Sequence, residues 1–415
     1  MKIGIIGAGI SGLACADLLH ETHDIVVFEA AERIGGHTNT VRVDFADETH
    51  QVDTGFIVFN ERNYPNFTRL LAHHAVPTQA GEMSFSVSRG ATGLEYRATS
   101  LNTLYARRAN VVDPGFTRML VDIVRFNRSA RRLLDGPPDA RTLGELIDAG
   151  RYGRRFVSDY LVPIGASIWS ADPTRFTDMP AVTFARFFDN HGLLGLGSQP
   201  QWRTITGGSD EYVKKLTRPF ADRIRVGAEV DKIVRRHDGV EVHSNVGGPE
   251  QFDHVVLAVH SDQALRLLGD PSDAEGDVLG AIPYQPNVAV LHTDRRMLPR
   301  RRRVWASWNY HLLDDERRDV AVTYWMNSLQ NLTSRHELCV TLNRQDDIAP
   351  ETVIATFEYQ HPVIDARAVA AQRRRHEIQG RRRTWFCGAY WGYGFHEDGV
   401  RSAIDVCRAF GRPSR

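Results

Sequence analysis

The sequence predicts an α/β protein in which a doubly wound, Rossmann-like domain of separate chain segments is joined to a second, α+β domain. Three observations support this prediction. Residues 1–30 follow the order strand, glycine turn, helix, strand, which is how a doubly wound domain begins. The 415 residues exceed one ordinary core. A long helical block then interrupts the α/β pattern after about residue 61.

The N-terminal unit has the pattern of a dinucleotide-binding motif. A β-branched run at residues 3–6 precedes the stretch GAGISG at 7–12, and after a helix the second strand, DIVVFEA, contains Glu29. In this motif the first glycine makes a tight turn, the second lets the backbone approach a pyrophosphate, and the third lets the helix pack close to the sheet. We therefore expect a dinucleotide, with NAD and FAD both open at this point, at Gly7, Gly9, Ser11, Gly12 and Glu29.

The middle of the chain is predicted as a mostly helical insert followed by strands. Apolar residues recur at spacings of three and four in 63–76, 115–134 and 142–150. Thr142 and Glu145 form a capping box. Strands with period two between 284 and 358 predict a sheet beneath this second domain. The domain boundaries that follow are 1–61, 200–265 and 380–415 for the first domain, and 62–199 and 266–379 for the second.

Composition excludes several classes of function. A formal net charge of zero argues against a nucleic-acid-binding protein. The four cysteines, at 15, 339, 387 and 407, have no CxxC pair and no metal-ligand spacing, so we expect neither a disulfide framework nor a metal site and favour a cytoplasmic location. No apolar run approaches the roughly 18 residues of a membrane-spanning helix.

The residues after Glu29 resemble a known superfamily. Arg33, Gly35 and Gly36 make an RxGG pattern, and a strand leads to QVDTGFIVFN at 51–60. This arrangement resembles the flavin amine oxidase and phytoene desaturase superfamily, which implies an amine oxidase-like fold and FAD. No cysteine stands in FEYQHPVID, where monoamine oxidases attach flavin, so noncovalent FAD is expected. The resemblance adds as cofactor-binding residues Arg33, Gly36, His37, Gly55, Phe56 and Val230, the last through its backbone to adenine. Ala31 and His37 depart from the basic residues that are usual there.

Several stretches resemble a narrower family. DTGFIVFNERNYPNF, EMSFSVS, GASIWS, NHGLL, PQWRT and FCGAYWGYGFHEDGVRSA are similar to a bacterial family of FAD-dependent oxidoreductases and to the flavin domain fused to some cyclopropane fatty acid synthases. That resemblance implies a lipid acyl chain, or another apolar small molecule, as the substrate and a lipid methyltransferase as a partner.

The C-terminal stretch 384–407 is expected to complete the flavin site. A strand at 384–387 would place Gly388 at the sheet edge, and Gly392 and Gly394 would let the chain lie against a flat cofactor. A helix starting near Gly399 would present the N–H groups of Gly399 and Val400 to the flavin carbonyl edge or the ribityl phosphate.

Candidates for chemistry lie in the same stretch. The resemblance places Phe395 facing the flavin, and His396 is the one plausible proton handler, with a structural role as the alternative. Tyr359, His361 and Tyr393 are weaker candidates, and Glu397 is predicted as a structural or ribityl partner.

The expected function is an FAD-dependent oxidoreductase that transfers a hydride from an apolar substrate to flavin N5. Two alternatives remain open. One alternative is an amine oxidase, which the absence of a lysine in the strand region near flavin N5 argues against. The other is a flavoprotein without catalysis that acts as a partner of a lipid methyltransferase. Arginine runs at 300–303 and 381–383 are either solvated faces or a peripheral contact with the inner face of an anionic membrane.

Overall fold

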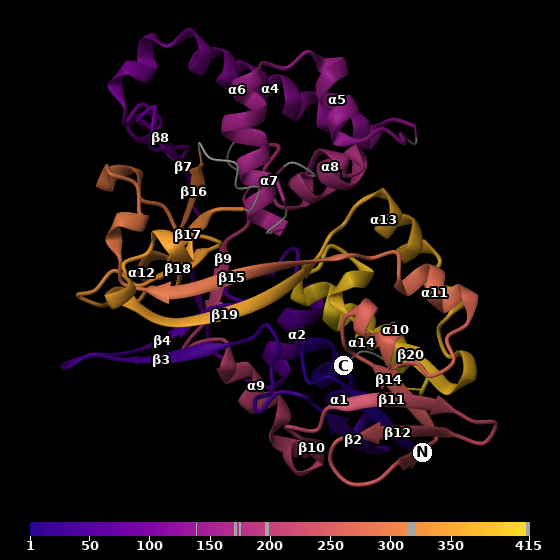
Figure 1. Ribbon diagram of the computed structural model, residues 1–415. Coiled ribbons are helices and arrows are strands. Elements are labelled where there is room, and N and C mark those ends of the chain that lie inside the picture. Colours follow the sequence, from indigo (N-terminus) through magenta and orange to yellow (C-terminus); the bar gives the residue numbers. More distant parts are fainter. Residues whose placement is uncertain (138, 170–171, 174–175, 196–198, 314–319, 412–415) are drawn as a thin grey trace.

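The computed structural model describes residues 1–137, 139–169, 172–173, 176–195, 199–313 and 320–411 (Figure 1). Its first sheet is parallel throughout and has the strand order β10-β2-β1-β14-β20. The strands are β1 (Lys2–Ile6), β2 (Asp24–Phe28), β10 (Ile224–Arg225), β14 (His254–Leu257) and β20 (Thr384–Phe386). Strands from the two ends of the chain and from its middle therefore meet in one sheet, as a doubly wound domain requires.

Two helices pack on this sheet, α1 (Ile10–Leu19) and α14 (His396–Arg408). Every residue of α1 is buried, because the helix is apolar on all sides and lies in the core of the domain. The core there includes Ile3, Ile5, Leu13, Val256 and Ala403. An antiparallel sheet of β11 (Val230–Arg235), β12 (Val240–Ser244) and β13 (Glu250–Phe252) flanks it, with α10 (Ser261–Leu267) and α11 (Asp273–Leu279) nearby.

The second sheet has seven strands in the order β19-β15-β18-β17-β16-β7-β8. Its longest pairing joins β15 (Tyr284–His292) to β19 (Val353–Pro362) along their lengths. The other strands are β7 (Phe85–Arg89), β8 (Leu94–Arg97), β16 (Trp308–Leu312), β17 (Val322–Trp325) and β18 (Cys339–Leu342). The sheet predicted from the period-two pattern between 284 and 358 is thus present.

A group of helices lies beyond the β7–β8 end of this sheet, at the top of Figure 1. They are α3 (Leu101–Leu104), α4 (Pro114–Asp135), α5 (Leu143–Gly150), α6 (Arg154–Phe156), α7 (Val162–Trp169) and α8 (Ala181–Asn190). The predicted capping box of α5 is confirmed, since Thr142 Oγ1 accepts from the Glu145 N–H at 3.2 Å and Glu145 Oε2 accepts from the Thr142 N–H at 2.8 Å.

The prediction of a helical insert from residue 62 onward was wrong in part. Residues 78–97 form β6 (Thr78–Ala80), β7 and β8, and β7 pairs in parallel with β16. These strands are short, and β6 and β7 pair with strands more than 100 residues away, so local periodicity did not reveal them. β8 pairs with β7 as a hairpin. The aromatic stretches at 163–173 and 185–196 lie partly outside the described residues, at 170–171 and 196.

The remaining elements connect the two sheets. A hairpin of β3 (Thr40–Asp44) and β4 (Thr49–Asp53) and a small sheet of β5 (Phe59–Asn60), β9 (Trp202–Ile205) and β6 lie between them. The other helices are α2 (Pro65–His73), α9 (Asp210–Thr217), α12 (Met326–Leu329), which contacts β17 and β18, and α13 (Ala366–Arg373), which contacts α11. Within the described part of the chain, no helix combines the length and apolarity needed to span a bilayer.

Candidate functional site

The carboxyl ends of the parallel strands meet at one edge of the first sheet. β1 leads into Gly7, β2 into Glu29, β14 into Ala258 and β20, after Cys387, into Gly388. In open α/β sheets this edge is where ligands bind. Gly388 is buried there, and its N–H donates to Ser402 Oγ of α14 at 2.9 Å.

The glycine turn after β1 has the geometry that a dinucleotide motif needs. Gly7 has a φ of +102°, and its N–H donates to Phe28 O at 2.8 Å. A Cβ on Gly12 would lie 1.9 Å from Gly7 O, so only glycine lets α1 start this close to the turn. By contrast, a Cβ on Gly9 would meet nothing within 4 Å. The space in front of Gly9 is therefore open to a ligand.

The RxGG loop lies directly against this turn. The Gly35 N–H donates to Ala8 O at 2.8 Å, and a Cβ on Gly36 would lie 3.1 Å from the Gly9 Cα atom. Gly36 itself is exposed. The Arg33 guanidinium donates to the carbonyl oxygens of the same loop, Gly36 at 2.8 Å and Thr38 at 2.9 Å. Arg33 thus holds the loop in place in this structure, which is a supporting role for the site.

Glu29 marks the other end of the turn. Its carboxylate accepts from the Ala8 N–H at 2.8 Å and the Ala31 N–H at 3.0 Å, and its backbone oxygen accepts from the Ala228 N–H at 2.8 Å. Val230, two residues further on, begins β11 and is buried. Glu29 and Val230 are therefore close together, where a ribose and an adenine of one nucleotide would be adjacent.

These residues fit FAD. No side chain caps the N-terminus of α1, so its N–H groups and positive dipole end face the open space at Gly9, which suits a pyrophosphate. Gly55, by contrast, serves a contact within the protein, since its Cβ would lie 2.1 Å from His37 O. The Phe56 N–H donates to the same His37 oxygen at 2.8 Å. The nucleotide end of FAD thus fits between Glu29, Gly9 and the RxGG loop.

His396 lies behind Phe56. The two rings stack with centroids 3.6 Å apart, and His396 Nε2 lies 3.0 Å from Thr38 Oγ1 and 3.2 Å from Tyr212 OH. Burial lowers the pKa of His396 to about 3, so the ring is neutral. A catalytic role for His396 stays a prediction, and its contacts match the structural alternative.

The predicted start of the C-terminal helix was wrong by three residues. α14 begins at His396, and the Gly399 N–H donates to Phe395 O at 3.1 Å, so neither Gly399 nor Val400 presents a free N–H at a helix end. Asp398 sets the start, because its carboxylate accepts from the Phe395 N–H at 3.1 Å and the Tyr393 N–H at 2.9 Å.

The glycines near α14 serve contacts within the protein. A Cβ on Gly399 would lie 2.8 Å from Ser11 Oγ, so Gly399 lets α14 pack closely against α1. A Cβ on Gly392 would lie 2.1 Å from Asp398 Oδ1, and Gly394 has a φ of +93° beside Pro362. The expected reason for Gly392 and Gly394, contact with a flat cofactor, is therefore replaced by packing and turn geometry.

Glu397 is engaged by another helix. Its carboxylate accepts from the N–H groups of Asn66 and Phe67, both at 3.0 Å, and from the Asn66 side chain. These N–H groups belong to the first turn of α2, which has no cap of its own. Of the two predicted roles for Glu397, the structural one accounts for these contacts.

Aromatic rings form a wall next to Phe395, which we call the ring wall: Phe187, His191, Trp202, Tyr393 and Phe395. Phe187 is central, with ring centroids 5.5 Å from Phe395, 5.5 Å from Tyr393 and 3.9 Å from His191. Trp202 also stacks on His191, with ring centroids 5.8 Å apart. The wall combines residues of α8 and its C-cap, the nearby strand β9, and the segment before α14, almost 200 residues later in the chain.

His191 is the residue of this wall that sequence reasoning missed. Its Nδ1 lies 2.8 Å from Phe187 O and therefore carries the proton, which leaves Nε2 as an acceptor with no hydrogen-bond partner among the described residues. Burial lowers the pKa of His191 to about 4. The signal available in sequence was only a histidine before a glycine at a helix end, which is common in proteins without any such role.

Three further histidines come together beside the RxGG loop. The ring centroid of His37 lies 5.3 Å from that of His361 and 6.1 Å from that of His260. The pKa of each of the three histidines is lowered, mainly by burial. His37 Nε2 lies 3.1 Å from Gln360 O. Among the residues that the structure describes, no cluster of His, Cys, Asp and Glu has metal-binding geometry. These histidines are neutral polar groups at the edge of the cofactor site.

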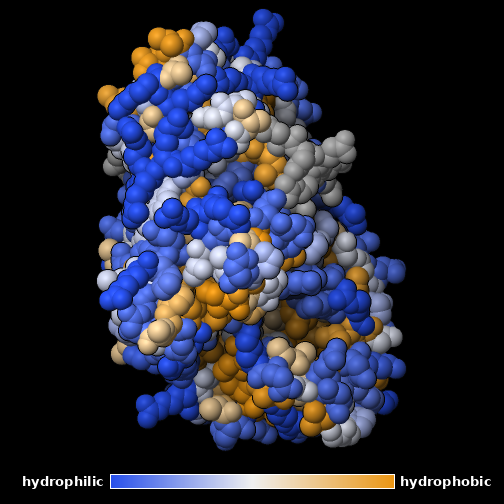
Figure 2. Space-filling view, turned by 60° about the vertical axis from the view of Figure 1, so that its left-hand side comes forward, coloured by the Kyte–Doolittle hydropathy of each residue, from blue (hydrophilic) through white to orange (hydrophobic). Residues whose placement is uncertain are grey.

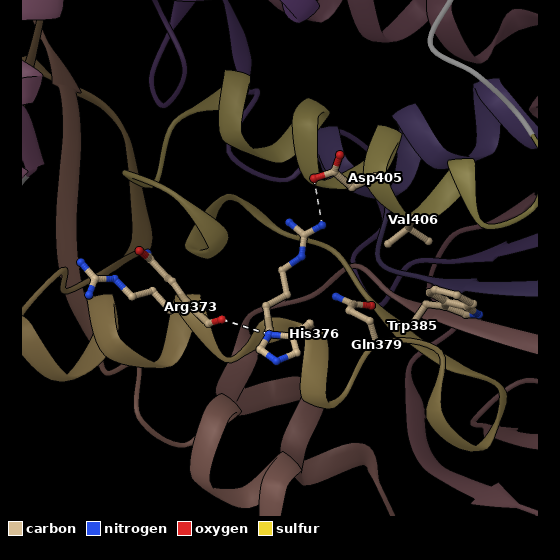
Figure 3. Close-up of a pocket in the computed structure, with 8 residues that line it drawn as sticks. Arg373, His376, Gln379, Trp385, Asp405 and Val406 are labelled. Carbon is tan, nitrogen blue, oxygen red and sulfur yellow. Dashed lines mark hydrogen bonds and ion pairs between the residues drawn. The ribbon is translucent and has the colours of Figure 1, made fainter.

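A surface cavity of about 490 Å³ lies away from this site, between α13 and α14 (Figure 3). Arg375 pairs with Asp405 at 2.8 Å across it, and His376 Nδ1 lies 3.1 Å from Arg373 O. Gln379 exchanges two hydrogen bonds with the backbone of Phe386. Most of its polar groups satisfy one another, so this cavity is a structural feature and not the candidate active site.

Comparisons with known proteins agree with the geometry. The family described as flavin containing amine oxidoreductase matches residues 10–316. AofH of Mycobacterium tuberculosis, which carries the name of a flavin-containing monoamine oxidase, is 26% identical over 281 residues, covering 65% of this chain and 59% of that protein. The flavin-dependent L-tryptophan oxidase RebO of Lentzea aerocolonigenes is 25% identical over 314 residues, covering 66% and 61%. The chain thus spans about three-fifths of the length of these curated relatives.

Solved structures share the fold over nearly the whole chain. Cyclohexylamine oxidase from Brevibacterium oxydans has a TM-score of 0.69 with 16% identity, covering 99% of both chains. A fatty acid isomerase from P. acnes that produces CLA has a TM-score of 0.70 with 15% identity, covering 98% of both chains. These likenesses confirm the predicted amine oxidase-like α/β fold. With the family match over most of its length and a site that fits the cofactor, the chain belongs to the flavin containing amine oxidoreductase family, whose cofactor is FAD.

Proposed function

We propose that the protein is an FAD-dependent oxidoreductase that acts on an apolar substrate, a fatty acyl chain, by desaturation or double-bond chemistry. The observation that carries this proposal is the ring wall. Its members are aromatic side chains and one neutral histidine, which suits a hydrocarbon chain better than a charged group.

Two carboxylates near the ring wall are already engaged, while the cations Arg62 and Arg186 lie close enough to interact electrostatically with His191 and with Tyr393. Glu397 caps α2, and Asp398 accepts backbone N–H groups and pairs with Arg401 at 2.6 Å. None of the four lysines belongs to the wall: Lys2 pairs with Glu250, Lys214 with Glu211, Lys215 donates to Ala75 O, and Lys232 is exposed on β11. An ammonium group would therefore find no free carboxylate at Phe395, and the lysine usual near flavin N5 in amine oxidases is missing.

The residues of the wall have separate tasks in this proposal. FAD, when bound, supplies a ring that accepts a hydride from a substrate C–H bond. Phe395 and Phe187 would hold the acyl chain and exclude water. His191 would accept a proton or a hydrogen bond at Nε2, because its Nδ1–H is committed to Phe187 O.

Amine oxidation is the second candidate, and family membership favours it. The curated relatives are named for monoamine and amino acid oxidation. The two candidates differ in the substrate that reduces the flavin and in the release of peroxide, which amine oxidation in air would produce. The resemblance to a bacterial family also supports a lipid methyltransferase of the cyclopropane synthase type as a partner. In that case the protein could also be a flavoprotein that assists the methyltransferase without catalysing a reaction itself.

The test is anaerobic addition of substrates to the FAD-loaded protein. We expect unsaturated acyl lipids to bleach the flavin absorbance or to emerge with a changed mass or double-bond position, and amines to do neither. Rapid reduction by an amine with no effect of any lipid would overturn the proposal in favour of amine oxidation. Lack of both reactions, with co-purification of a methyltransferase, would favour the partner role.

His191→Phe is the informative variant. A phenylalanine at position 191 can still stack on both Phe187 and Trp202, and it removes the two ring nitrogen atoms. We expect unchanged FAD content and a loss in lipid conversion of about 100-fold, the usual contribution of general acid–base catalysis. A variant that converts lipid at the wild-type rate would show that His191 only packs.

A further inference from the structure

One part of the helical region exposes large apolar side chains to solvent. Ten such residues are exposed in the described part of the chain, and five of them fall between residues 101 and 124. Val112 is 82% exposed and Leu101 is 75% exposed. Figure 2 shows apolar side chains at the upper end of the molecule, the end that carries these helices in Figure 1. The five residues are Leu101, Val111, Val112, Val121 and Val124.

The two faces of α4 explain why these side chains are not core residues. Phe116, Met119, Phe126 and Ala130 form the buried face of the helix. Val121 and Val124 lie on the opposite, exposed face, and the 3-10 turn at Arg108–Val112 leads directly into the helix with Val111 and Val112 exposed. Clustered aliphatic side chains on the solvent side of a helix mark an interaction surface more often than an accident of sequence.

Unpaired cations accompany this apolar surface. Arg107, Arg108, Arg128, Arg131 and Arg132 make no ion pair with any described residue. Two nearby carboxylates are occupied by other groups, and Asp135 is exposed at the end of α4, beyond this surface. Asp122 is buried and accepts from Arg118 Nε at 2.9 Å and from the Gly153 N–H at 2.8 Å, and Asp113 pairs with Arg155 at 2.8 Å. The surface therefore combines exposed aliphatic side chains with an excess of positive charge.

We propose that this surface, residues 101–132 with its five aliphatic side chains and five unpaired arginines, docks on an anionic phospholipid bilayer. The valines and Leu101 would enter the interfacial layer while the guanidinium groups contact lipid phosphates, the arrangement of an amphipathic helix lying in a membrane interface. Charge complementarity selects this occupant, since the exposed aliphatics come with unpaired cations rather than with carboxylates.

The arginine runs that the sequence singled out are weaker candidates for this contact. The two runs lie on different parts of the molecule from each other: residues 300–303 lie beside β8 and residues 381–383 beside β20 (Figure 1). Arg301 pairs with Glu95 and Arg382 pairs with Asp270, so part of their charge is neutralised. Neither run itself contains an exposed large apolar side chain, although the run at 300–303 shares its neighbouring strand β8 with α3, which carries Leu101.

The docking surface lies on the outer side of the helices that build the ring wall. Phe126 of α4 contacts Phe184 of α8 with ring centroids 5.9 Å apart, and α8 also carries Phe187 of the wall. A bilayer bound to α4 would thus be separated from the flavin domain by α8. That the docked lipid is also the substrate rests on the proposed function, whereas the docking itself rests on the exposed residues alone.

The experiment is co-sedimentation of the full-length, FAD-loaded protein with vesicles at low salt. We expect binding to phosphatidylcholine vesicles that contain phosphatidylglycerol, and much weaker binding to phosphatidylcholine alone. Arg128→Gln with Arg131→Gln should weaken binding roughly 30-fold, from the usual contribution of two near-surface cations. Val112→Ser with Val124→Ser should weaken it about tenfold by removing inserted side chains.

The matched control is Arg373→Gln with Arg381→Gln. These two arginines are also exposed and without an ion pair among the described residues, but they lie near β20, so this variant should bind like wild type. Absence of binding to the anionic vesicles, or equal loss in the control and the α4 variants, would overturn the proposal. This experiment measures binding alone. If the protein binds anionic vesicles but does not react with lipid in the anaerobic assay, only the proposed function is contradicted.

Discussion

Gly9 is a residue at which the protein needs empty space. Its φ of −77° and ψ of −179° suit any amino acid, and a Cβ there would meet nothing within 4 Å. Glycine is therefore not required for folding at this position. We predict that Gly9→Val leaves the stability of the FAD-free protein within about 0.5 kcal/mol of wild type. The valine would occupy the cofactor space, so FAD affinity should fall by about 10- to 100-fold, measured by flavin fluorescence titration.

Gly12 provides the matching contrast three residues later. A Cβ there would lie 1.9 Å from Gly7 O, a backbone atom that cannot move without opening the turn. Gly12→Val should therefore destabilise the FAD-free protein itself, by about 3 kcal/mol, in denaturant unfolding. If the Gly9 variant lost as much stability as the Gly12 variant, the space at Gly9 would not be a ligand site.

At the scale of elements, α14 connects three parts of the protein. Its first turn supplies Glu397 to cap α2, Gly399 packs against α1, and the preceding Phe395 joins the ring wall. We predict that Glu397→Gln destabilises the FAD-free protein by about 1–2 kcal/mol, because an amide replaces one of the acceptors of the α2 N–H groups. The measurement is denaturant unfolding with and without FAD.

The comparison of the two forms separates the roles considered for Glu397. A structural cap costs the same stability in both forms, so FAD affinity stays unchanged. A ribityl partner would add a loss that appears only when FAD is present. A twofold or smaller change in FAD affinity is the expected outcome, with Thr142→Ala, which removes the local cap of α5, as a control of similar cost.

The sequence predicted well the elements that depend on local pattern. The unit β1–α1–β2 with its glycines is recognisable because each glycine has a local geometric reason, and the α5 capping box spans only Thr142 and Glu145. The start of α14 was misplaced because Gly399 looked like a helix boundary. Its role is packing against Ser11, nearly 400 residues earlier in the chain, which no local pattern reports.

The ring wall was beyond sequence reasoning for the same physical reason. Phe187, His191, Trp202 and Phe395 come from three elements whose contact is decided by the tertiary packing of α8 against α14 and β9. The resemblance suggested Phe395 alone. The histidines at 37, 260 and 361 likewise have no common spacing and meet only at the edge of the first sheet.

At the scale of the whole molecule, buried neutral histidines make the fold sensitive to acid. Burial lowers the pKa of His311 and His396 to about 3 and that of His191, His292 and His361 to about 4. In the unfolded chain a histidine titrates near 6.5. Above that pH both states are neutral and these groups contribute their full stability. Below it the unfolded chain takes up protons that the native state does not, so stability falls as the pH is lowered from about 6.5 towards 4.

Four carboxyl groups act in the opposite direction, because burial raises the pKa of Asp53 and also that of Asp210, Glu397 and Asp398. The pKa of Asp53 rises to about 7 even though its carboxylate accepts from Thr40, Ser209 and Gln330. The unfolded aspartate titrates near 3.9, so this residue costs stability as the pH rises from about 4 to 7 and relieves that cost in acid. Each such group offsets one histidine. The pKa of His37, His254 and His260 is also lowered by burial, so eight histidines outweigh four carboxyl groups among the described residues.

We therefore predict a steep loss of stability in mild acid. Each histidine can contribute at most about 1.4 kcal/mol per pH unit, so eight histidines less four carboxyl groups give a limiting slope of about 5 kcal/mol per pH unit around pH 5. Urea unfolding at pH 7.5, 6.5, 5.5 and 5.0 measures it. His311→Gln retains a hydrogen-bond partner for Thr323 and removes one titrating group, so it should reduce the slope by about 1.4 kcal/mol per pH unit. A free energy of unfolding that stays level from pH 7.5 to 5 would mean that these rings are protonated in the native protein, and that their burial does not govern its response to acid.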